Sequence, residues 1–262
     1  MRNRNILSEI TPIVIGGFFL VAPVVMLLKF APAERVPAED YIRAVRAAMQ
    51  PGPKDVSRSL LSVNLDQPVT VVTWLRSDQV PLYKDKTPDK KNTWVTVVPW
   101  LKAFCQNYVR SHGPDPEQLT LRLKQRLGLP PGFNYDSFVE FKVDPKDTSR
   151  FFRPCGNQSP TTTTCDPASP PKPWEVRDDL KASDTGTGKK VEQYWLLSNY
   201  YWSFSPKDQY PWSSLGYSFD WAPREDGSED FVRWGESEFV ISPGVPIRDV
   251  SATDTVAYCT PQ

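Results

Sequence analysis

The sequence predicts an α+β fold: a domain with a mainly antiparallel sheet, a few short helices and long disulfide-stapled loops, behind a single N-terminal transmembrane helix. Three features predict it: a charge-free apolar segment near the start, β-branched runs separated by Gly- and Pro-rich turns, and four cysteines in the body. Residues 1–30 are expected to form a cytoplasmic tip and membrane anchor, 31–37 a linker, and 38–262 one periplasmic domain.

The first element is expected to cross a membrane. Residues 13–28 carry no charge, and with their apolar neighbours they reach about 20 residues, the length of a spanning helix. Arg2 and Arg4 precede this segment. The positive-inside tendency therefore places the N-terminus in the cytoplasm and the body in the periplasm of a bacterial inner membrane. A cleaved signal peptide is the alternative, because residues 31–33 resemble a small-residue cleavage site. The residues expected to anchor the chain in lipid are Ile13, Phe18, Phe19, Leu20, Pro23, Met26 and Leu28.

A short helix and two strands are expected after the linker. Glu39 and Asp40 would occupy the first turn of a helix over 38–49, where the helix dipole favours acidic side chains. The β-branched runs 68–75 and 93–98 are typical of strands. Between them, residues 84–92 are rich in Lys and Asp and predict a solvated loop.

The middle of the chain contains the clearest helix signal. Asp115 is suited to the N-cap, Pro116 to the first helical position and Gly128 to the position after the C-cap. A shorter helix over 101–110 is expected before it, and the alternating residues 137–143 predict a strand.

The later segments are expected to be irregular first and strand-like afterwards. Residues 144–190 lack apolar periodicity, and loops of that length often contact a partner. The aromatic-rich stretches 194–204, 215–221, 236–241 and 255–258 are expected to be strands.

The four cysteines predict two disulfides in an exported domain. Cys155 and Cys165 bracket a segment without periodicity and are expected to pair, which leaves Cys105 to pair with Cys259. A zinc site or a redox pair is the alternative, but the chain lacks the CxxC spacing that is typical of both.

Composition and motifs argue against several classes of activity. The 31 basic and 31 acidic residues cancel, whereas a nucleic-acid-binding protein needs a basic surface. The lone histidine, His112, lies in a helix-entry turn and is expected at the surface or as a cap. No GxSxG, GxGxxG or Walker-type loop occurs. We therefore expect a protein that is not an enzyme, with no catalytic residue, metal or cofactor.

Aromatic density between residues 194 and 221 is the strongest compositional feature. Such residues fill a core, anchor a protein interface or form a sugar-stacking platform. The residues assigned to partner binding are Trp195, Tyr201, Trp202, Tyr210 and Trp212.

The alternative function is an envelope protein that binds or cleaves glycans with this aromatic segment and nearby carboxylates, since glycosidases use paired acids. The candidate acids are Asp220, Asp226, Glu229, Asp230, Glu236 and Glu238. Residues 226–230 are better explained as a polar turn between strands, and Glu236 and Glu238 are expected to share one exposed strand face.

Several longer strings carry a resemblance. They lie at residues 94–105, 127–141, 152–165, 210–221 (YPWSSLGYSFDW) and 237–240 (SEFV). Together they resemble an uncharacterised family of exported bacterial proteins over residues 68–262, and the family brings no catalytic residues.

The overall layout is similar to the extra periplasmic subunit of some phototrophic reaction-centre–antenna complexes. This resemblance implies a membrane-anchored accessory subunit whose partners are integral-membrane proteins and their periplasmic domains. Such a subunit would stabilise or help assemble the complex without chemistry of its own.

Overall fold

The computed structural model describes residues 37–165, 189–205, 209–228 and 230–261. The chain divides into two units, Met1–Glu34 and Arg35–Gln262, and every described residue belongs to the second. The expected membrane anchor and most of the linker lie outside the described residues. Of the helices in the described ranges, none combines the length and hydrophobicity that a membrane span requires.

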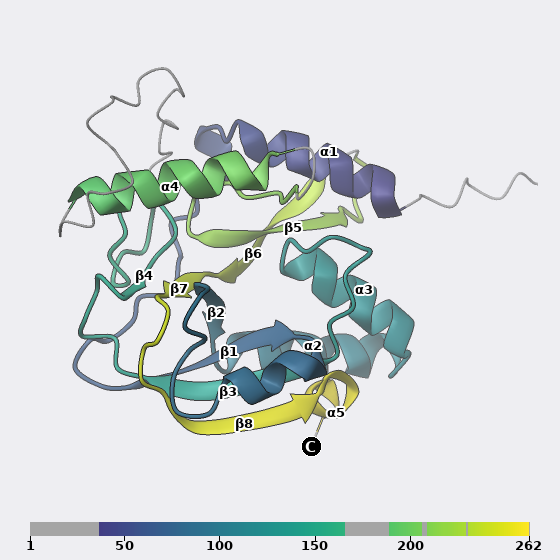
Figure 1. Ribbon diagram of the computed structural model, residues 1–262. Helices are drawn as coiled ribbons and strands as arrows, with labels where there is room; N and C mark the ends of the chain where they lie inside the picture. Colours follow the sequence, from purple (N-terminus) through teal and green to yellow (C-terminus); the bar gives the residue numbers. More distant parts are fainter. Residues whose placement is uncertain (1–36, 166–188, 206–208, 229, 262) are drawn as a thin grey trace, which may run out of the picture. The chain divides into compact units, whose positions relative to one another are not determined.

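The main sheet contains six strands in the order β4-β7-β2-β1-β3-β8, with antiparallel pairing throughout (Figure 1). Its strands are β1 (Val69–Leu75), β2 (Thr93–Val97), β3 (Ser137–Val143), β4 (Phe151–Phe152), β7 (Phe239–Ile241) and β8 (Arg248–Asp254). A separate antiparallel pair consists of β5 (Tyr217–Pro223) and β6 (Phe231–Ser237). Only Glu238 separates β6 from β7, so this segment connects the two sheets. The predicted α+β class with a mainly antiparallel sheet is confirmed.

Short helices accompany the sheets, as expected. In the described ranges the α-helices are α1 (Pro37–Met49), α2 (Trp100–His112), α3 (Pro116–Arg126), α4 (Lys189–Ser203) and α5 (Thr255–Cys259). Two 3-10 helices, η1 (Pro53–Asp55) and η2 (Ser77–Leu82), lie in the connections around β1.

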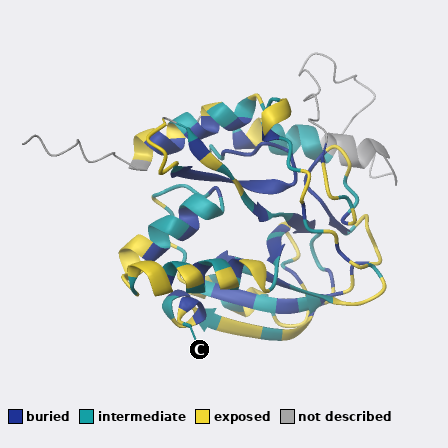
Figure 2. Cartoon of the chain, turned by 180° about the vertical axis from the view of Figure 1, so that it is seen from behind, coloured by how far each residue is buried: buried dark blue, intermediate teal, exposed yellow. Residues whose placement is uncertain are grey.

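Helices cover one face of the main sheet at β1 and β3. β1 and β3 pair over seven consecutive positions, from Val69↔Val143 to Leu75↔Ser137. On one face of this pair, α2, α3 and α5 contribute to an apolar cluster, and Figure 2 shows exposed residues on the outward turns of the helices. The cluster includes Val72, Trp74, Leu101, Leu119, Leu123, Phe138 and Tyr258. Burial of this apolar surface is the main contribution to the stability of the packing between these helices and the sheet.

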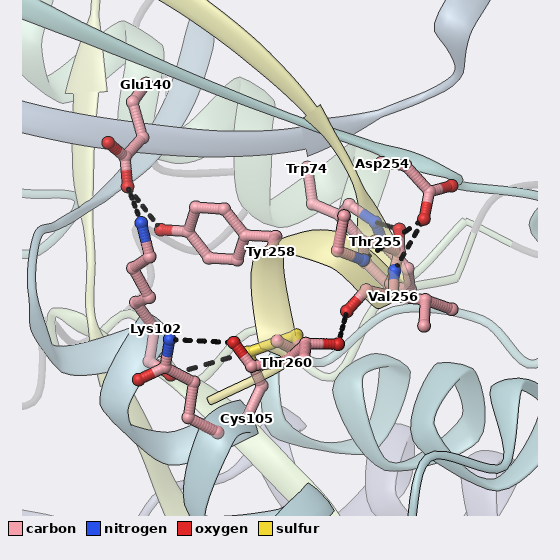
Figure 3. The surroundings of a disulfide bond; sticks show 12 residues. Trp74, Lys102, Cys105, Glu140, Asp254, Thr255, Val256, Tyr258 and Thr260 are labelled. Carbon is pink, nitrogen blue, oxygen red and sulfur yellow. Dashed lines mark hydrogen bonds and ion pairs between the residues drawn. A yellow bond between two sulfur atoms is a disulfide. The ribbon is translucent and has the colours of Figure 1, made fainter. Parts of the chain in front are cut away.

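Both expected disulfides are present, with the expected pairing. Cys105 of α2 and Cys259 of α5 join two helices of the apolar cluster (Figure 3). Beside them, the Tyr258 hydroxyl donates a hydrogen bond to Glu140 Oε1 at 2.7 Å, and Lys102 Nζ lies 4.7 Å from the centre of the Tyr258 ring.

The other cores lie on the opposite face of the sheet and beneath α1. Val71, Val95, Phe141 and Phe239 belong to a cluster that β1, β2, β3, β4 and β7 share. α1 packs on the β5–β6 pair, where the Tyr41 and Trp221 rings meet edge to face with centroids 5.5 Å apart.

The helix predicted after His112 has the expected ends. The Asp115 carboxylate accepts hydrogen bonds from two backbone N–H groups of the first turn of α3, at 2.9 and 3.2 Å. Gly128 follows the C-cap with φ +66°, a conformation that favours glycine. His112 itself is exposed and stacks on Tyr108 with ring centroids 4.3 Å apart, so it is the surface residue that the sequence predicted.

Two segments predicted as strands are instead helical. Most of residues 194–204 belong to α4, and 255–258 belong to α5. β-branched and aromatic residues suggested strands, but strand propensity is weak and depends on context. At α5 the decisive feature is Asp254, whose carboxylate accepts hydrogen bonds from Val256 N at 2.9 Å and Ala257 N at 3.3 Å and so caps a helix.

Candidate binding site

The main sheet opens between β1 and β2. These strands pair at only two positions, Val71↔Val97 and Val72↔Thr96, although β1 continues to Leu75 and β2 begins at Thr93. A cavity of about 850 Å³ occupies this opening. Its walls come from β1, β2, η2 with the loop after it, the start of α2, the segment after α3, α4, residues 210–212 and β5. The volume lies within the usual range of small-molecule sites, roughly 300–1,000 Å³.

One wall of the cavity is aromatic. Trp94 of β2 and Trp212 line it, and their ring centroids lie 6.4 Å apart. Trp195 of α4 supports both rings, with centroids 6.0 Å from Trp94 and 6.2 Å from Trp212, and Phe152 of β4 meets Trp195 edge to face at 5.0 Å. Because each ring packs against others, the wall is held in one position.

Three residues of the cavity lining each carry a buried polar atom that has no hydrogen-bond partner among the described residues. The atoms are Thr96 Oγ1, Trp212 Nε1 and Glu238 Oε2. Val95 pairs with Phe239, so the register of the antiparallel strands places Thr96 and Glu238 across from each other. Native proteins satisfy most buried polar groups with hydrogen bonds. Three residues with unpartnered polar atoms around one cavity therefore indicate a place for a polar ligand.

Glu238 has the most perturbed carboxyl of the site. Burial raises its pKa from 4.5 to about 8, and the charge of Arg153 opposes this shift. At neutral pH the carboxyl is therefore mainly protonated and can both donate and accept a hydrogen bond. Arg153 is fully buried, donates to Gly216 O at 3.1 Å, and has a pKa that burial lowers to about 10. It is not among the residues that line the cavity.

The residues predicted to bind a partner largely gather around this site. Trp202, Tyr210 and Trp212 line the cavity, and Trp195 packs behind the wall. Trp202 is 61 % exposed and Tyr201 is 68 % exposed, so both also contribute to the outer surface of α4. The structure therefore places three of the five residues on the cavity lining and Trp195 behind it, and leaves Tyr201 on the surface.

Most of the candidate carboxylates serve structural ion pairs. Arg122 binds Asp220 at 2.8 Å and Arg126 binds Glu236 at 2.7 Å, both across from α3 to the β5–β6 pair. The remaining paired acids, Asp226 and Asp230, are held in or beside the β5–β6 turn by Arg224 and Arg233. Residue 229 lies outside the described residues.

The prediction that Glu236 and Glu238 share an exposed face is wrong. Glu236 is buried beside Arg126, because β6 packs against α3 at this point, and Glu238 is turned toward the cavity at the junction of the two sheets. Asp89 is the other acid on the cavity, and it is exposed and bound to Lys86 at 2.9 Å. Of the acids predicted from the sequence that the structure describes, Glu238 is therefore the one that lines the cavity.

Sequence reasoning missed Trp94 and Thr96 as site residues. Both were assigned to a strand, and their spacing of two places them on the same face of β2. A Trp and a Thr on one face of an otherwise Val-rich strand were the available signal.

The described residues contain no group of three or more His, Cys, Asp or Glu side chains that could hold a metal ion. Comparison of the chain with protein-family models, curated proteins and solved structures found no match.

Proposed function

We propose that this protein is a non-catalytic, membrane-anchored accessory subunit whose periplasmic domain binds integral-membrane subunits of a large bioenergetic complex. It would stabilise that complex or help to assemble it. A photosynthetic reaction-centre–light-harvesting complex is the assembly that the layout of the chain resembles.

The observation that carries this proposal is the exposed aromatic pair on α4. Tyr201 and Trp202 are 68 % and 61 % exposed although they are adjacent and large. Trp and Tyr dominate the binding energy of protein interfaces, because each buries a large area with few rotatable bonds. A surface that exposes both in adjacent positions is therefore a candidate interface.

Two further features favour a partner outside the cytoplasm. The disulfides Cys105–Cys259 and Cys155–Cys165 belong to an oxidising compartment. The charge-free segment 13–28 would hold the domain beside integral-membrane proteins, which raises their effective concentration at its surface.

Purification from native membranes in mild detergent tests the proposal. The full chain is expected to co-purify in fixed ratio with integral-membrane subunits, and Tyr201→Ala/Trp202→Ala to reduce that ratio at least tenfold. Trp100→Ala and Trp234→Ala are matched controls, because these tryptophans are 57 % and 51 % exposed on other elements. Isolation of the wild-type chain as a lone monomer, or equal loss in the control variants, would contradict the proposal.

A further inference from the structure

We propose that the cavity between β1 and β2 binds a short neutral oligosaccharide. The cavity shares Trp202 with the exposed surface of α4, but Thr96, Trp212 and Glu238 lie outside α4. Variants of these three residues therefore test the cavity separately from the accessory-subunit function. The proposal rests on the open sheet, the tryptophan wall and three unpartnered polar atoms that share one cavity.

The unpartnered atoms define what the ligand must offer. Trp212 Nε1 can only donate, Thr96 Oγ1 can do both, and Glu238 Oε2 belongs to a carboxyl group that can accept. A ligand must therefore present acceptors and donors within one cavity. The hydroxyl groups of a sugar do so, because each one donates and accepts.

The aromatic wall defines the second requirement. The rings of Trp94 and Trp212 line the cavity, and Tyr210 and Trp202 lie on its lining as well. Flat rings of this kind bury apolar surface well. The C–H faces of a pyranose ring provide that surface, while its hydroxyl groups point outward around the edge toward the polar atoms.

Charge at the site favours a neutral ligand over an ion. The basic residues that line the cavity are Lys86, Lys90 and Lys91, which lie together in the exposed loop after η2, and Lys86 is bound to Asp89. The three unpartnered polar atoms belong to Thr96 and Trp212, which carry no charge, and to Glu238, whose carboxyl is mainly protonated at neutral pH. These buried groups therefore favour neither sign of charge.

Binding of neutral trisaccharides to the full chain in detergent tests the proposal. The probes are cellotriose, maltotriose and triacetylchitotriose, measured by calorimetry and by tryptophan fluorescence. At least one of them is expected to bind saturably with a dissociation constant below 1 mM and to change the fluorescence. Failure of all three probes, or preferential binding of a charged sugar such as a uronic-acid trimer, would overturn the proposal.

Conservative variants locate the site. Thr96→Val and Glu238→Met each remove the polar group with little change in side-chain size, and Trp212→Phe removes the indole N–H together with part of the ring. Each is expected to weaken binding about tenfold, equivalent to about 1.4 kcal/mol. Thermal unfolding shows that each variant folds. Trp234→Phe is the matched control, because Trp234 is on β6 and donates to Asp55 O at 3.2 Å away from the cavity lining. Binding that all three variants leave unchanged would place the sugar elsewhere and overturn the proposal, whereas co-purification with membrane subunits would be unaffected.

Discussion

Two tryptophans with the same exposure lie in different chemical surroundings. Trp74 and Trp212 are both 7 % exposed. Trp74 Nε1 donates to Thr255 Oγ1 at 2.8 Å, whereas Trp212 Nε1 has no partner among the described residues. Both residues line the cavity. Trp74 also belongs to the apolar cluster that α2, α3 and α5 cover, which we call the β1–β3 side, and Trp212 packs against the β2–β7 side.

This contrast extends to the two sides as a whole. On the β1–β3 side the strands pair at seven positions and the Cys105–Cys259 disulfide joins the covering helices. On the β2–β7 side, β2 pairs with β1 at only two positions. Thr96 and Glu238 there carry polar atoms that have no hydrogen-bond partner among the described residues. Buried polar groups that form hydrogen bonds stabilise a fold, whereas buried polar groups without a partner destabilise it. A bound ligand that forms the missing hydrogen bonds can offset that loss. The β1–β3 side therefore provides stability, and the β2–β7 side provides the candidate site.

The disulfides should differ most in their contribution to stability. Cys105 and Cys259 are separated by 154 residues, and Cys155 and Cys165 by 10. In the chain-entropy account, the variant Cys105→Ala/Cys259→Ala should lose about 5 kcal/mol of unfolding free energy and Cys155→Ala/Cys165→Ala about 3 kcal/mol. Urea unfolding followed by circular dichroism measures both. A larger loss in the second variant would reverse the assignment of stability to the β1–β3 side.

Glu238 should make the β2–β7 side sensitive to pH. Its pKa is about 8 in the folded chain and 4.5 as the ordinary value. As pH rises through this window, the unfolded chain releases the proton and the folded chain retains it, so the residue destabilises the fold increasingly up to about pH 8. The effect is at most about 1.4 kcal/mol per pH unit. Glu238→Gln should remove this contribution, so the advantage of the variant in unfolding free energy grows between pH 5 and pH 8. Parallel curves for the two proteins would show that Glu238 is ionised in the fold.

The two buried tryptophans allow a direct test of the contrast. Trp74→Phe and Trp212→Phe remove the same indole N–H and a similar ring area. Trp74→Phe also leaves the Thr255 hydroxyl without its donor, so it should cost about 1 kcal/mol more than Trp212→Phe. Thermal unfolding of both variants measures the difference. Equal losses would mean that Trp212 Nε1 already has a partner, such as an ordered water.

Elements with local signals were predictable from the sequence, and those that depend on distant contacts were not. Asp115 and Gly128 marked the ends of α3, and strict alternation marked β3, because caps and strand periodicity are encoded in neighbouring residues. α4 was missed because its aromatic residues favour strands, although Trp202 and Ser203 follow Asn199 by three and four residues and all three line one cavity.

The candidate site shows the same limit. Partner-binding residues such as Trp202, Tyr210 and Trp212 were selected from aromatic density, and they do line the cavity. Thr96 and Glu238 were not recognised together, because 141 residues of sequence lie between positions 96 and 238 and only the β2–β7 pairing brings them close. The opening itself results from β1 leaving β2, which no local pattern in either strand reveals.

The smallest expected effect is also the most specific. Thr96→Val replaces a buried hydroxyl that has no partner among the described residues with a methyl group of the same shape. It should leave the unfolding free energy unchanged or raise it by up to about 1 kcal/mol, because an unpaired polar group is removed from the interior. Thr87 is the matched control on the same cavity: its hydroxyl donates to Ser242 O at 2.8 Å and accepts from Val245 N at 2.9 Å. Thr87→Val should therefore lose about 1–3 kcal/mol. If both variants lose stability equally in urea unfolding, Thr96 has a structural hydrogen bond, and the β2–β7 side is no more open than the rest of the sheet.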